Sequence, residues 1–117
     1  MSFKERVVFL DRAAFTNGDL PIPDFEHNWS EYPFTEAADR VPRLFWATTA
    51  ITHATPIDAE AIGQLHKLIR VIVTGPAVID VAACEARGIA VRHLPVSDTP
   101  GLVLIGLLEA LVDAAKH

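Results

Sequence analysis

The chain has 117 residues, half of them hydrophobic, and a formal net charge of −5 at pH 7. This length suits a single domain with its own hydrophobic core. Its ten Lys and Arg residues are scattered, which argues against a nucleic-acid or anionic-membrane partner, since both need clustered positive charge. The first ten residues hold too short an apolar run for a signal peptide, and the single Cys84 cannot form an internal disulfide. We therefore expect a cytoplasmic protein in which Cys84 is a buried, inert thiol.

The first third of the chain predicts two strands joined by a loop. An apolar run at residues 6–11 predicts the first strand. The connection at residues 12–27 contains two prolines, Pro21 and Pro23, which favour a loop over a long helix. Alternation at residues 28–33 predicts a second strand at the edge of a sheet.

The middle of the chain predicts helices that alternate with strands. Thr35 is a good N-cap for a helix that should stop near Pro42, and residues 44–52 predict the third strand. The segment 57–68 predicts a helix capped by Asp58. Its apolar residues recur at the spacing of a core-facing helical stripe: Ala61, Ile62, Leu65 and Leu68.

The next segment repeats the pattern of strand, helix and strand. Residues 69–75 predict the fourth strand, Asp80–Arg87 a helix that Gly88 ends, and residues 89–95 the fifth strand. The third and fourth strands are apolar nearly throughout, as in parallel sheets that are buried on both faces. We therefore predict an α/β, flavodoxin-like three-layer sandwich with about five parallel strands in the order 2-1-3-4-5.

This fold class indicates where a ligand would bind. In open α/β sheets ligands bind beyond the carboxyl ends of the strands, near the point where the strand order reverses. Asp11, His53 and the pair Thr74-Gly75 would meet there. Asp11 would either cap the turn after the first strand or contact His53 or a ligand. His53 is either a surface residue or a ligand contact, and Thr74-Gly75 is either a plain turn or a nest of amides that binds an anion. The other histidines share no metal-ligand spacing, so we expect no metal site.

The last segment, residues 100–117, predicts an apolar helix that either belongs to the domain formed by residues 1–99 or forms a dimer interface. It is too short to span a bilayer, and a helix that is apolar on every side must be buried on every side. We therefore expect a homodimer centred on residues 101–115. The predicted interface residues are Leu104, Leu107, Leu108 and Leu111, which form a stripe along one face of this helix.

Four segments of the chain resemble a known family when they are taken in order. They are "VVFLDR", "HNWSEYPFT", "ITHATPIDAEAIGQLHKLIRVIVTG" and "VIDVAACEARGIAVRHLP". Over residues 6–95 this order resembles the N-terminal substrate-binding domain of D-isomer-specific 2-hydroxyacid dehydrogenases, in particular the glycerate dehydrogenase and hydroxypyruvate reductase group. The resemblance implies a flavodoxin-like domain in which the amides of Thr74-Gly75 hold the carboxylate of a 2-hydroxy or 2-oxo acid.

The resemblance also implies chemistry that this chain does not supply by itself. The family binds NAD or NADP in a second domain. Its catalytic histidine, the acidic partner of that histidine and an arginine that orients the substrate lie in that domain or beyond it, and none has a matching position here. The segment "GLVLIG" lacks the G-x-G-x-x-G spacing, and Pro76 removes one amide donor from the turn. We expect no cofactor bound by this chain alone. Two hypotheses follow: a non-catalytic binding or assembly module, or the substrate-binding subunit of an oxidoreductase completed by a separate NAD-binding subunit.

Overall fold

The computed structural model describes residues 4–16, 19–94 and 100–115. Five parallel strands form one sheet in the order β2-β1-β3-β4-β5, which confirms the predicted order. The strands are β1 (Glu5–Phe9), β2 (His27–Glu31), β3 (Thr49–Thr52), β4 (Arg70–Val73) and β5 (Ala90–His93).

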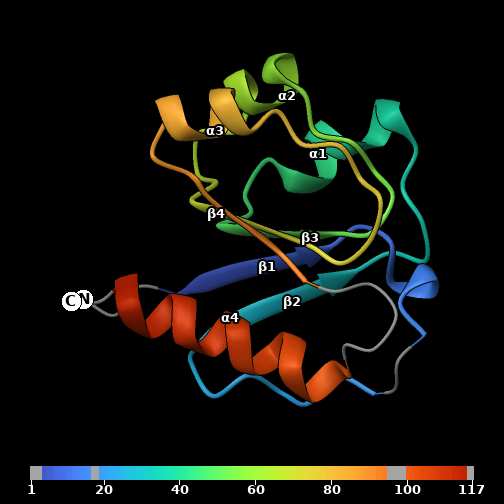
Figure 1. Cartoon of the computed structure of the whole chain (residues 1–117), viewed down its shortest axis with the longest axis vertical. Helices are drawn as coiled ribbons and strands as arrows, with labels where there is room; N and C mark the ends of the chain where they lie inside the picture. The colour runs from blue at the N-terminus through green and yellow to red at the C-terminus, as the bar shows by residue number, and fades with distance from the viewer. Residues whose placement is uncertain (1–3, 17–18, 95–99, 116–117) are drawn as a thin grey trace.

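Helices cover both faces of the sheet, so the chain folds as the predicted three-layer sandwich (Figure 1). One face carries α1 (Arg40–Leu44), α2 (Ala59–Gln64) and α3 (Val81–Ala86), and the other carries α4 (Gly101–Ala115). Two short 3-10 turns, η1 (Arg12–Ala14) and η2 (Ala37–Asp39), follow β1 and precede α1.

Each face of the sheet has its own hydrophobic core, because side chains alternate along a strand. Val8, Ala50 and Val71 belong to the core under α1, α2 and α3. The neighbouring positions belong to the core under α4, namely Val7, Phe9, Ile51 and Ile72. Every residue of β3 and β4 is buried, as expected for strands covered on both faces.

The caps predicted for α2 and α3 are confirmed. The carboxylate of Asp58 accepts from the Ala61 N–H at 2.9 Å, and that of Asp80 accepts from the Ala83 N–H at 3.0 Å. Gly88 has φ +72°, a left-handed backbone conformation that commonly follows the last turn of a helix. Glycine adopts it without steric strain because it has no Cβ. The four predicted core positions Ala61, Ile62, Leu65 and Leu68 are all buried.

The prediction for residues 35–52 is wrong in its details. Helix α1 begins at Arg40 and contains Pro42 in its first turn. Backbone N–H groups in a first turn have no acceptor within the helix, so a proline there, which lacks an N–H, removes no helical hydrogen bond. Thr35 does not cap a helix; its hydroxyl donates to the Leu10 carbonyl at 2.7 Å. The third strand begins at Thr49, not at residue 44, because α1 extends to Leu44.

Cys84 is fully buried, as predicted. Burial raises the pKa of its thiol, and the charges of Asp80 and Glu85 raise it further. A higher pKa lowers the thiolate fraction at neutral pH, so the thiol is a poor nucleophile.

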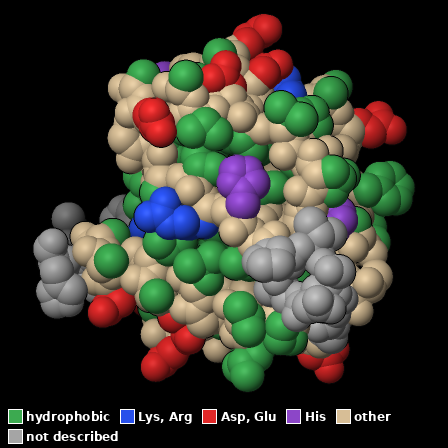
Figure 2. Space-filling model, viewed as in Figure 1, with side chains coloured by type: hydrophobic (Ala, Val, Ile, Leu, Met, Phe, Trp, Pro, Cys, Tyr) green, Lys and Arg blue, Asp and Glu red, His purple; other side chains and the backbone are tan. Residues whose placement is uncertain are grey.

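Helix α4 places part of its apolar surface in the core of its own domain. Leu104 and Leu108 are fully buried, and Leu107 and Leu111 are partly buried against the same core. Leu102 and Val103 stay exposed, at 71% and 49%, and hydrophobic side chains reach the surface over α4 in the lower half of Figure 2. Leu104 and Leu108 are therefore not free to form the predicted dimer interface unless the helix exchanges between copies. The homodimer itself remains a prediction, and with this fold it would use the outer side of α4. No helix within the described residues is long and apolar enough to cross a membrane.

Candidate functional site

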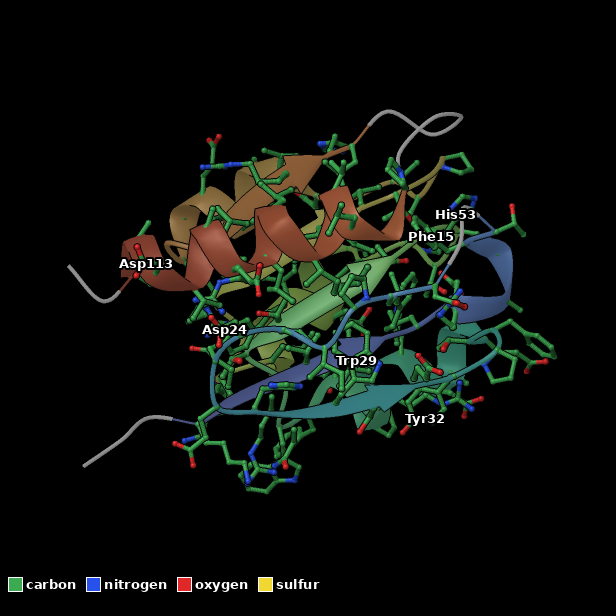
Figure 3. The ribbon with its side chains drawn as sticks, turned by 90° about the horizontal axis from the view of Figure 1, so that it is seen from below. Phe15, Asp24, Trp29, Tyr32, His53 and Asp113 are labelled. Carbon is green, nitrogen blue, oxygen red and sulfur yellow. The ribbon has the colours of Figure 1, made fainter. Side chains whose placement is uncertain are left out.

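The polar residues predicted to meet at the sheet edge lie close together. Asp11 follows β1, His53 follows β3, and Thr74 follows β4, so all three lie beyond the carboxyl ends of adjacent strands. Figure 3 shows His53 at this end of the sheet. The site therefore lies next to the β1–β3 boundary, where the strand order reverses.

Asp11 fixes the loop that follows β3. It is 3% exposed, and its Oδ2 accepts from the N–H groups of His53 (3.1 Å), Ala54 (2.9 Å) and Thr55 (3.0 Å). The Thr55 hydroxyl donates to Oδ1 at 2.7 Å, and the Thr52 hydroxyl donates to Oδ2 at 3.1 Å. The proposed cap of the turn after the first strand is wrong, since the side chain makes no hydrogen bond there. Asp11 instead contacts the backbone of His53 and positions that residue.

The network also determines the charge of Asp11. Burial by itself raises the pKa of this carboxyl, but the hydrogen bonds from Ala54, Thr55 and His53 together hold it below its usual value. Asp11 is therefore a carboxylate at neutral pH, and its hydrogen-bonding capacity is used within the chain.

His53 and Thr74-Gly75 are in direct contact. The imidazole Nδ1 lies 3.1 Å from the Thr74 hydroxyl, and Nε2 has no hydrogen-bond partner among the described residues. A Cβ at Gly75 would lie 2.6 Å from the His53 carbonyl oxygen and 2.7 Å from two ring carbons. Only glycine allows the ring to lie this close to the β4–α3 turn.

The backbone of this turn offers fewer donors than the sequence suggested. The Thr74 N–H donates to the Thr52 carbonyl at 2.9 Å, and the Ala77 N–H donates to the His53 carbonyl at 3.0 Å. Pro76 has no N–H. Among residues 74–77, the Gly75 N–H is the one amide without an acceptor. The arrangement can therefore present one amide donor beside one imidazole to a small anion.

Comparison with known proteins identifies a family. No protein-family model matches the chain. A putative 2-hydroxyacid dehydrogenase of Haemophilus influenzae is 38% identical over 111 residues, 91% of this chain. A glycerate dehydrogenase of Methylorubrum extorquens is 36% identical over 115 residues, 92% of this chain. The chain is related to the 2-hydroxyacid dehydrogenases. This finding confirms the resemblance drawn from the sequence.

The match covers only part of these dehydrogenases. The chain spans about 35% of the length of each relative. Their activities are therefore properties of longer proteins.

Sequence reasoning missed the threonines that complete the network around Asp11. The hydroxyls of Thr52 and Thr55 both donate to Asp11, from positions more than forty residues away along the chain. The only local signal is the run "THAT" at residues 52–55, directly after a strand. Among the described residues, no three His, Cys, Asp or Glu side chains lie close enough together to hold a metal ion.

Proposed function

We propose that this chain is a small-carboxylate-binding domain of the 2-hydroxyacid dehydrogenase type. The Gly75 N–H would donate to one oxygen of a 2-hydroxy or 2-oxo acid, and His53 would donate through Nε2. The supporting observation is the contact between the His53 ring and Gly75, next to an amide without an acceptor. Asp11 contributes by fixing the backbone that carries His53.

A second proposal rests on the lengths of the two relatives. Since the match covers about 35% of each, the domain would supply the substrate-binding surface of an oxidoreductase. Hydride transfer requires a bound nicotinamide that the protein positions against the substrate. In this proposal a separate NAD-binding subunit holds NAD or NADP.

Carboxylate binding is tested by a thermal-shift titration with glycerate, glyoxylate and hydroxypyruvate. A ligand at 100 times its Kd would stabilise the fold by about 2.7 kcal/mol. Gly75→Ala should abolish the shift, because its Cβ would displace His53. Gly63→Ala is the matched control, since a Cβ there meets no atom within 4 Å. The proposal would be contradicted if the melting temperature of the wild-type chain did not change at tens of millimolar of these acids. It would also be contradicted if Gly75→Ala bound them as the wild type does.

The two proposals agree on the isolated chain and differ in whether a separate cofactor-binding subunit would make it active. We expect the purified chain alone not to oxidise NADH with glyoxylate or hydroxypyruvate, because its sequence holds no dinucleotide-binding turn. An absorbance assay at 340 nm against a boiled control measures this. Turnover above that control would show that both proposals misassign the chemistry. Turnover that appears only on adding a separate cofactor-binding subunit would favour the second proposal.

A further inference from the structure

Strand β2 is an edge strand whose outer side has unpaired backbone groups. It pairs only with β1 in the described sheet, and Figure 3 shows no other strand along its outer side. The Tyr32 N–H donates to Phe9, and the Glu26 carbonyl accepts from Glu5. The even-numbered residues of β2 therefore direct their N–H and C=O groups to β1. Since these directions alternate along a strand, the three odd-numbered residues direct theirs outward.

This edge lacks three of the usual devices against strand pairing. Natural edge strands are commonly protected by Lys or Pro residues or by bulges. Residues 27–31 contain neither Lys nor Pro, and their register with β1 is continuous. The edge is therefore open to a further strand.

The sequence of β2 complements itself in one antiparallel register. Around a two-fold axis through Trp29, Trp29 pairs with its copy, His27 pairs with Glu31, and Asn28 lies opposite Ser30. The pairs that involve Trp29, His27 and Glu31 are those whose backbone groups face outward, so each can exchange two hydrogen bonds. The same register places an acidic side chain opposite an imidazole at two symmetric positions.

The surroundings of β2 leave room for such a partner. The side chains of His27, Trp29 and Glu31 line a groove of about 480 Å³ on the α4 side of the strand. Ile22 lines the same groove and is 86% exposed. A partner strand would bring its own Trp29 beside this groove and cover apolar surface that is now in water.

We propose that β2 pairs antiparallel with β2 of a second copy of this chain, centred on Trp29, and joins the two sheets into one. The interface differs from the outer side of α4 and does not depend on the proposed function. A five-residue strand gives a short interface, so the dimer forms in a concentration-dependent manner.

Amide hydrogen exchange measured by NMR tests the register directly. As the concentration rises from micromolar to roughly millimolar, the N–H groups of Trp29 and Glu31 should become protected. Those of Asn28 and Ser30 should be protected throughout, because β1 already accepts from them. Trp29 and Glu31 amides that exchange rapidly at every concentration would overturn the proposal.

Charge substitutions at His27 distinguish this interface from one at α4. His27→Glu faces Glu31 of the partner and should weaken dimerisation roughly tenfold, since it acts twice by symmetry. His27→Lys should strengthen it, and the double variant His27→Glu/Glu31→Lys should restore it. Both single variants lose the same contact of the imidazole with the Phe25 carbonyl, so they are matched. The pairing would be refuted if His27→Glu and His27→Lys dimerised equally. It would also be refuted if Val103→Glu on α4 disrupted the dimer and His27→Glu did not.

Discussion

Replacing Arg70 with methionine is expected to lower the free energy of unfolding by about 3–5 kcal/mol, because Glu5 would keep a buried charge without a partner. Arg70 Nη1 lies 2.6 Å from Glu5 Oε1, and these side chains are 3% and 7% exposed. The Thr48 hydroxyl donates to the same Glu5 oxygen at 2.7 Å, and Arg70 donates to the Thr49 hydroxyl at 2.9 Å. The pair links β1 to β4 across β3 at the amino ends of these strands. Urea denaturation at pH 7 measures the effect.

A double variant and an exposed arginine serve as controls for this prediction. Glu5→Leu/Arg70→Met removes both charges and should recover most of the lost stability, since apolar replacement of a buried pair is often neutral. Arg92→Met alters an exposed residue of β5 and should change stability by no more than about 0.5 kcal/mol. If the double variant lost as much stability as Arg70→Met, the unpaired charge of Glu5 would not be the cause of the loss.

Asp11→Ala should lower the free energy of unfolding by at least about 3 kcal/mol, because it leaves three N–H groups of the β3–α2 loop without their acceptor. Those groups belong to His53, Ala54 and Thr55. The variant should also lose the thermal shift with small carboxylates, since His53 is no longer held against Gly75. Asp11→Asn should be milder, because its amide oxygen can still accept from the loop.

The contribution of Asp11 to stability depends on pH in a defined direction. Its folded pKa lies below the usual value, so the stabilisation is complete above the unfolded pKa of about 4. It is lost as pH falls through the folded pKa. Denaturation curves of wild type and Asp11→Asn from pH 7 to pH 2 should therefore converge in acid. A difference in unfolding free energy that stays constant over this range would show that the carboxylate charge is not what stabilises the loop.

The sequence alone determined the features that depend on local chemistry. Asp58 and Asp80 cap helices because their carboxylates accept from N–H groups three residues ahead, and Gly88 ends α3 because glycine tolerates a positive φ. The alternation of apolar strands with short helices implied parallel strands, and the predicted sheet order followed from it. The convergence of Asp11, His53 and Thr74 was predictable for the same reason, since parallel strands bring their carboxyl ends to one edge.

Only the tertiary structure decided how these residues are used, because their partners are far away in the chain. Asp11 acts on residues 52–55, and Thr74 has its N–H committed to Thr52, which reduces the predicted nest to one amide. Local patterns also could not decide which side of α4 is buried: the helix is apolar nearly all round, so packing against the sheet selects Leu104 and Leu108 and leaves Leu102 in water. A side chain's neighbours in sequence determine its backbone conformation, whereas its hydrogen-bond partners and burial depend on segments that meet only when the sheet has formed.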